Sequence, residues 1–286
     1  MARVTPDQIR QMKARGERIA MLTAYDYSTA QILDTAGLPL LLVGDTMGMV
    51  ILGHDSTLPV TVDDIIRHTG AVVRGTKHAL VIADLPFGSF QVSPEETVRH
   101  AVRIMKEAGP QAVKLEGGVR SAPSVRLLTE AGIPVMGHVG LTPQSVNAFG
   151  GFKVQGKTER AARALLDDVA ALEEAGVFAV VLELVPFELA RLITERTSVP
   201  TIGIGAGPYC DGEVQVLHDI LGLFPDFTPK HTKRYAELGA LMRDAAAAYM
   251  REVTERTFPT EQQSSKLDPA VLEAVRREPP ADDSQE

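Results

Sequence analysis

The chain has 286 residues, of which 44% are hydrophobic and 23% are charged, with a formal net charge of −8. This length suffices for one large α/β domain, and the acidic balance argues against the basic surface that nucleic-acid binding requires. The first residues lack the apolar core of a signal peptide, and no apolar run approaches the roughly 20 residues of a membrane span. The single cysteine, Cys210, suits a reducing compartment. We therefore expect a cytoplasmic protein with neither membrane nor nucleic-acid partners.

Short apolar runs recur along the chain and predict strands. Seven of them are continuously apolar, which is typical of parallel strands covered on both faces. An eighth strand is harder to place, and the run "DILGLF" at 219–224 is the candidate. The seven clear runs lie at residues 19–25, 38–45, 79–87, 112–118, 133–140, 178–185 and 199–207.

Segments with helical signals separate these runs. Ser93 followed by Pro94 predicts the start of one helix, and Gly109 predicts its end. Thr158 and Gly176 bound a second helix in the same way. A regular alternation of strands and helices favours a closed (βα)8 TIM barrel over a doubly wound open sheet.

The two ends of the chain add helices to this barrel. Thr5 and Pro6 predict a short N-terminal helix that could plug the barrel floor, and residues 233–253 predict a long helix after the last strand. From about residue 260 the composition shifts to Gln, Ser, Asp, Glu and Pro. We expect a barrel domain at 1–259 with a C-terminal helical extension, and a polar tail at 260–286 that is disordered or loosely docked.

Four apolar runs end on a carboxylate: Asp45, Asp84, Glu116 and Glu183. In a (βα)8 barrel the C-terminal ends of the strands form one catalytic face, so the four side chains should converge there. Converging carboxylates repel one another and need a positive partner. Hard oxygen ligands without a cysteine or a histidine pair indicate Mg²⁺ rather than zinc, with substrate oxygens completing the coordination.

Other residues near the same strand ends could contribute to such a site. Lys114 lies two positions before Glu116 and so points to the same face, and His138 ends the fifth run. Apolar residues follow Glu183, a setting that suits a general base, and we expect it to act as one. The glycine-rich stretch 203–207 could cradle an anion, or it could simply form a tight turn.

Each of these residues also has a purely structural interpretation. A carboxylate after a strand is often the N-cap of the next helix, which could explain Asp45, Asp84 or Glu116 taken singly. Glu183 could be a surface glutamate, and His138 could be a structural histidine. The repetition on consecutive strands favours the functional interpretation.

Several longer motifs together resemble one known family, ketopantoate hydroxymethyltransferase. The motifs are "MLTAYDYSTA", "VGDTMGMVILGHDSTLPVT", "ADLPFGSF", "VKLEGG", "GHVGLTPQSVNAFGGFKVQG", "LELVP" and "IGIGAG..CDG", in family order between about residues 13 and 259. The resemblance implies a (βα)8 barrel. It also implies transfer of the one-carbon unit of 5,10-methylenetetrahydrofolate to C3 of 3-methyl-2-oxobutanoate through a Mg²⁺-stabilised enolate, which forms 2-dehydropantoate (ketopantoate).

The resemblance also implies roles for individual residues. Asp45 and Asp84 would be metal ligands, with Glu116 as a third ligand, directly or through water. The ketoacid would contact Asp45, Thr46, Asp84 and Lys114, with His138 near the same pocket. Glu183 would accept the proton. The family further implies a homodecamer built from five dimers.

Two features depart from the family pattern, and two rival functions remain. The family usually has serine at the position of Thr46, a change that keeps the hydroxyl group, and this chain extends about twenty residues beyond the usual end. A lyase or mutase of the phosphoenolpyruvate mutase/isocitrate lyase kind would share the barrel but should use a cysteine or an extra arginine at the mouth. A metabolite-binding barrel without catalysis would need no base at Glu183.

Overall fold

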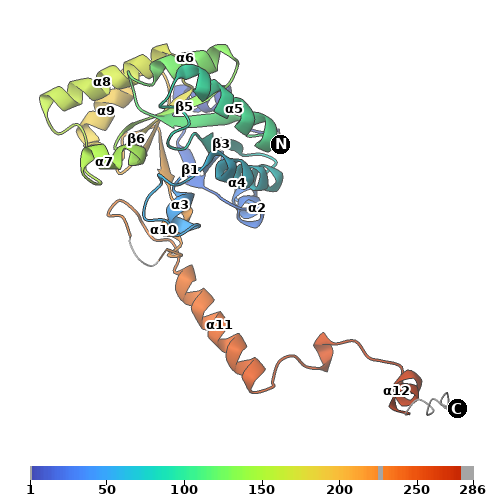
Figure 1. Ribbon diagram of the computed structural model, residues 1–286. Coiled ribbons are helices and arrows are strands. Elements are labelled where there is room, and N and C mark those ends of the chain that lie inside the picture. Colours follow the sequence, from blue (N-terminus) through green and yellow to red (C-terminus); the bar gives the residue numbers. More distant parts are fainter. Residues whose placement is uncertain (1, 225–227, 278–286) are drawn as a thin grey trace. The chain divides into compact units, whose positions relative to one another are not determined.

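Eight parallel strands form a closed barrel in the order β1 to β8 in the computed structural model, which describes residues 2–224 and 228–277 (Figure 1). Each strand pairs with its neighbours along the chain, and β1 pairs with β8 to close the barrel. The predicted (βα)8 fold is therefore confirmed. The strands are β1 (Ile19–Thr23), β2 (Leu40–Val43), β3 (Leu80–Asp84), β4 (Ala112–Glu116), β5 (Val135–Gly140), β6 (Ala179–Glu183), β7 (Thr201–Ile204) and β8 (Gly212–Gln215).

The helices of the barrel begin and end at the signals in the sequence. The Ser93 side chain accepts a hydrogen bond from the backbone N–H of Glu96, and Gly109 ends the same helix with a left-handed φ of 75°. Thr158 caps the next long helix in the same way. The helices are α1 (Pro6–Ala14), α2 (Tyr27–Thr35), α3 (Met47–Val50), α4 (Val62–Gly75), α5 (Pro94–Ala108), α6 (Ala122–Glu130), η1 (Pro143–Ser145), α7 (Val146–Phe149), α8 (Glu159–Glu174), α9 (Phe187–Arg196) and α10 (Leu217–Ile220).

The barrel interior has an apolar floor and a charged mouth. Alternate residues of a strand point to the same side, so on β3 Leu80 and Ile82 lie below Asp84 on the inner face. On β5, Met136 lies below His138 in the same way. The inner apolar cluster fills the lower part of the barrel, and the last inward positions of the strands are left for polar side chains.

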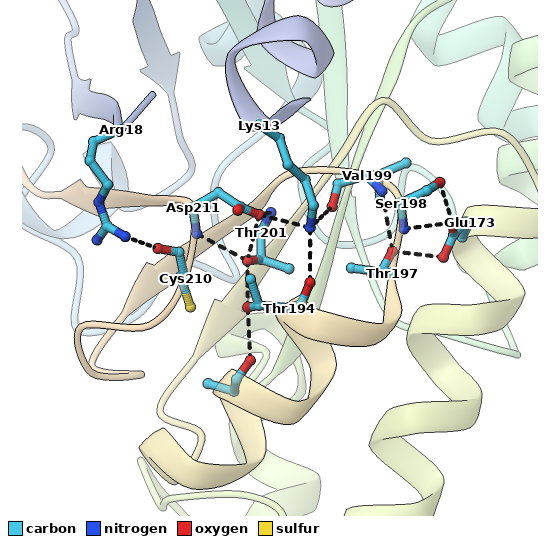
Figure 2. A network of polar contacts seen from close by, with 11 residues as sticks. Lys13, Arg18, Glu173, Thr194, Thr197, Ser198, Val199, Thr201, Cys210 and Asp211 are labelled. Atoms are coloured by element: carbon cyan, nitrogen blue, oxygen red, sulfur yellow. Dashed lines mark hydrogen bonds and ion pairs between the residues drawn. The ribbon is translucent and has the colours of Figure 1, made fainter. Parts of the chain in front are cut away.

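Helix α1 closes the lower end of the barrel, as the sequence predicts. Ile9 is fully buried and packs with the inner apolar cluster. Lys13 Nζ donates hydrogen bonds to the backbone oxygens of Thr194 (3.0 Å) and Val199 (3.1 Å), and it lies 3.0 Å from Asp211 Oδ2 (Figure 2). These contacts attach α1 to the segments that precede β7 and β8.

The prediction for the eighth strand is wrong. Residues 219–224 begin inside α10, whereas β8 is the preceding "GEVQ". This strand is short, and only alternate residues such as Val214 are buried, so it lacks the continuous apolar run by which the other strands are found. The described connection 205–211 joins β7 to β8 without a helix, which leaves one face of β8 less covered.

A second compact unit follows the barrel. The barrel unit comprises Met1–Ala236 and the second unit Glu237–Glu286, so the predicted boundary between residues 259 and 260 falls inside the second unit. The described part of this unit contains α11 (Leu238–Thr254), η2 (Glu261–Gln263) and α12 (Pro269–Arg276). Residues 278–286 of the predicted polar tail lie outside the described residues. Within the described ranges, no helix is long and apolar enough to cross a membrane.

Candidate active site

The predicted site residues lie together around one hollow at the C-terminal ends of the strands. The hollow has a volume of about 50 Å³. Asp84, Glu116 and Glu183 are the last residues of β3, β4 and β6, which places them at the mouth. The convergence expected from the sequence is therefore present, and it includes Asp45, Thr46, Asp84, Lys114, Glu116, His138 and Glu183.

An ion pair between Lys114 and Asp84 lies at the centre of the site. Lys114 Nζ is 2.7 Å from Asp84 Oδ1, and both side chains are almost fully buried. The other oxygen of Asp84 accepts a hydrogen bond from the backbone N–H of Asp45 (3.1 Å). Burial alone would lower the pKa of Lys114, but the neighbouring carboxylates Asp84, Glu116 and Asp45 more than offset it and raise the pKa. Lys114 is therefore a permanent cation.

The remaining carboxylates are not fully compensated by this one cation. Burial and the negative charge of Asp84 raise the pKa of Asp45 to about 7. Burial and the charge of Asp45 also raise the pKa of Glu116 well above its ordinary value. Among the described residues that line the hollow, Lys114 is the only lysine or arginine. An additional positive charge would therefore stabilise the ionised state of the cluster.

His138 connects the cation to Glu183. Its Nδ1 lies 3.4 Å from Lys114 Nζ, and its Nε2 lies 3.2 Å from Glu183 Oε2. Burial and the charge of Lys114 lower the pKa of His138, so the ring is neutral. The ammonium group of Lys114 can only donate, so Nδ1 accepts and Nε2 carries the proton that faces Glu183. This contact is close but not ideally aligned for a hydrogen bond.

Gln144, on η1 directly after β5, is a site residue that the sequence analysis did not single out. Its side-chain Nε2 donates to Asp45 Oδ2 (2.8 Å) and to the backbone oxygen of Leu85 (3.0 Å). Its backbone N–H donates to Glu116 Oε2 (3.1 Å). A polar residue immediately after Thr142–Pro143 at a strand end is the signal that could have identified it.

The donor set fits a hard divalent cation that keeps water ligands. No group of three or more His, Cys, Asp or Glu side chains in the described ranges forms a ready-made metal cage. Mg²⁺ needs no such cage, because it is usually held by one or two carboxylates together with water and substrate oxygens. Asp45 and Asp84 are adjacent and buried, and burial and the charge of Asp84 raise the pKa of Asp45, so a second positive charge beside Lys114 would stabilise the pair. Glu116 already accepts a hydrogen bond from Gln144.

Two other sequence features belong to the segment that runs from the end of β7 to the start of β8. Cys210 belongs to the connection before β8 and is not among the described residues that line the hollow, and burial raises the pKa of its thiol to about 11. Its position does not favour the cysteine nucleophile that a lyase would use at the mouth. Gly205 and Gly207 have φ values of +64° and +82°. A side chain at Gly207 would overlap Phe187. The glycine-rich stretch therefore satisfies the demands of a tight turn.

A barrel with carboxylates, a lysine and a histidine at the strand ends has the architecture of a (βα)8-barrel enzyme. The sequence profile of the family "Ketopantoate hydroxymethyltransferase" matches residues 3–261. A 3-methyl-2-oxobutanoate hydroxymethyltransferase of Dehalococcoides mccartyi is 57% identical over 275 residues, covering 96% of this chain and 98% of the relative. One of Chloroflexus aurantiacus is 58% identical over 273 residues, covering 96% of each chain. The chain belongs to the ketopantoate hydroxymethyltransferase family, whose members are transferases of the pantothenate pathway.

Solved structures of other barrel enzymes share the fold at low sequence identity. A phosphonopyruvate hydrolase in complex with oxalate and Mg²⁺ has a TM-score of 0.55 and 14% identity, covering 96% of this chain and 94% of that one. A 2,3-dimethylmalate lyase of the PEP mutase/isocitrate lyase superfamily has a TM-score of 0.53 and 16% identity, with coverage of 95% and 94%. This likeness concerns the fold.

Proposed function

We propose that this protein transfers the one-carbon unit of 5,10-methylenetetrahydrofolate to C3 of 3-methyl-2-oxobutanoate and thereby forms ketopantoate. The proposal rests on family membership and on the line of contacts from Lys114 through His138 to Glu183. This line places a permanent cation and an oxygen base on the two sides of one neutral histidine. An α-ketoacid needs both groups: a cation for its carboxylate and a base for the proton on C3.

The ketoacid binds in the hollow at the strand ends. Its carboxylate lies near the ammonium group of Lys114, which is the only fixed cation among the described residues lining this space. The hydroxyl of Thr46, at the start of α3, offers a further hydrogen bond. The burial of Lys114 strengthens its attraction for an anion, because little water screens the charge.

Glu183 is the general base that removes the proton from C3. Its carboxylate ends β6, is partly accessible from the hollow and faces His138 Nε2. The Nε2–H of the neutral histidine lies 3.2 Å from Glu183 Oε2, and the other oxygen of Glu183 is left for the substrate proton. After proton removal, the electron pair on C3 forms a bond to the methylene carbon that the folate supplies. Overall, both C–N bonds to that carbon break, water supplies the hydroxyl group, and the folate nitrogens take up the protons as tetrahydrofolate leaves.

Asp45 and Asp84 are the residues that would hold Mg²⁺, with Glu116 beside them. When bound, Mg²⁺ supplies a Lewis acid for the keto group of the substrate. Without the ion, burial and the neighbouring carboxylates raise the pKa of Asp45 and of Glu116, so these two groups bind protons more readily. A metal ion would therefore compete with protons for the two carboxylates. A cation that favours the ionised carboxylates would therefore bind more tightly as the pH rises.

The test is an assay of ketopantoate formation by mass spectrometry, with the folate, the ketoacid and Mg²⁺ omitted in turn. We expect product only in the complete mixture. Product formation that continues without methylenetetrahydrofolate would exclude it as the donor, and no product in the complete mixture would refute the proposed reaction. Full activity after removal of divalent ions with EDTA would refute the proposed role of Mg²⁺ alone.

A further inference from the structure

Gln144 lies at the end of a chain of polar contacts that begins on the backbone. The N–H groups of Gly88 (2.7 Å) and Phe90 (3.3 Å) donate to the side-chain oxygen of Gln91. Gln91 Nε2 donates to Gln144 Oε1 (3.1 Å), and Gln144 Nε2 donates to Asp45 Oδ2 (2.8 Å). The contacts therefore run in one direction, from the loop after β3 to a carboxylate of the site.

The direction of this chain is fixed by chemistry. A side-chain amide has a donating end and an accepting end, which a simple flip would exchange. Backbone N–H groups can only donate, so the oxygen of Gln91 must face them and its NH₂ group must face Gln144. The oxygen of Gln144 is then occupied, and its NH₂ group must face Asp45 and the carbonyl oxygen of Leu85.

Gln144 also holds a second carboxylate, because its backbone N–H donates to Glu116 Oε2. The residue is buried, with an exposed fraction of 4%. It therefore contacts two of the three proposed metal ligands, although it has no charge and is not one of them. No other donor in the described ranges reaches Asp45 Oδ2, and no protein group there donates to Asp45 Oδ1.

We propose that Gln144 is a positioning residue that fixes the orientation of Asp45 and Glu116, and that Gln91 fixes the orientation of Gln144. Asp45 Oδ2 is held by the amide, which leaves Oδ1 as the oxygen without a donor among the described residues. The inference rests on the proposed function, because Asp45 and Glu116 are the carboxylates that this reaction assigns to the metal and the ketoacid.

The sharpest test changes Gln91 without touching Asp45. Gln91→Glu keeps the oxygen that accepts from Gly88 and Phe90, but it replaces the donating NH₂ group with a second oxygen. This oxygen repels Gln144 Oε1 and favours a flipped Gln144 amide, with its oxygen against Asp45. Gln91 is exposed, so the variant should fold normally. Gln144→Met removes the amide directly and keeps the approximate shape.

We expect both variants to lower kcat/KM for ketopantoate formation by about ten- to a hundredfold, the loss expected for one hydrogen bond to a charged group. Both variants should also bind Mn²⁺ more weakly than the wild type in the absence of substrate, as measured by electron paramagnetic resonance. Gln111→Met is the matched control. That glutamine bonds Val81 and Arg3 away from the mouth, so its loss should lower the melting temperature and leave kcat/KM and Mn²⁺ binding unchanged.

The inference would be overturned if both variants had kcat/KM and Mn²⁺ affinity within about twofold of the wild type. The proposed function would then remain intact. Loss of activity accompanied by loss of the folded circular dichroism spectrum in both would also overturn it, because the role would then be structural. A wild-type protein that binds Mn²⁺ but forms no ketopantoate would overturn the proposed function alone. Mn²⁺ binding by the variants would then still test the positioning role of Gln144.

Discussion

Replacing Lys114 with methionine removes the one positive charge at the centre of the carboxylate cluster. Lys114 Nζ and Asp84 Oδ1 are 2.7 Å apart, with side-chain exposures of 5% and 3%. At an effective dielectric constant of about 20, two unit charges at this distance attract by about 6 kcal/mol. Part of this attraction offsets the cost of burying the charges, and breaking a buried pair typically costs about 3–5 kcal/mol. We expect Lys114→Met to lose that amount of stability at about pH 8.

The assay is urea denaturation of the metal-free protein. The free energies of unfolding of the variant and the wild type are compared where both show the same dependence on urea concentration. The double variant Asp84→Asn/Lys114→Met removes the uncompensated charge together with its partner, so it should recover part of the lost stability. Equal stability of Lys114→Met and wild type, or a double variant no more stable than Lys114→Met, would refute the electrostatic account of the site.

Three further predictions follow from the fold and the site. The pKa of Asp45 is about 7 in the folded protein, above its unfolded value, so its stability contribution is complete below about pH 4 and is lost as the pH rises towards 7. Thermal melting of metal-free wild type and Asp45→Asn should therefore converge at low pH, and a gap that does not change with pH would contradict this. Ile9→Ala should cost about 2–5 kcal/mol in urea denaturation, because Ile9 is fully buried on the barrel floor; a loss below about 1 kcal/mol would mean that α1 does not plug the barrel. The family resemblance predicts a homodecamer, and light scattering at micromolar concentration should give its mass rather than that of one chain.

The sequence predicted the parts of the fold that depend on local chemistry. Continuous apolar runs located β1 to β7, and Ser93, Gly109 and Thr158 located helix ends because capping needs particular side chains at particular positions. Strand β8 was missed because Glu213 and Gln215 interrupt its apolar pattern. Whether a strand is apolar on both faces depends on which elements cover its outer face, and the local sequence does not give this information.

The same distinction applies to the site. Asp84, Glu116 and Glu183 could be predicted because they end strands, and a barrel brings strand ends together. Asp45 follows β2 by two residues, so its position depends on the loop and on its contacts with Asp84 and Gln144. Gln144 was missed because it lies on η1, outside the strand pattern, and its importance depends on two carboxylates that are distant in sequence.

The most direct test of the account is exchange of the C3 proton of 3-methyl-2-oxobutanoate in D₂O, followed by proton NMR of its isopropyl signals. Proton removal precedes the one-carbon transfer, so wild-type protein with Mg²⁺ should catalyse exchange without any folate. Glu183→Gln keeps the shape and an oxygen to face His138 but loses the base. Exchange should fall by about 10²–10⁴-fold, the usual contribution of general-base catalysis, while ketoacid binding persists. Undiminished exchange in Glu183→Gln would contradict the central claim and assign the base to another residue, with His138 the next candidate.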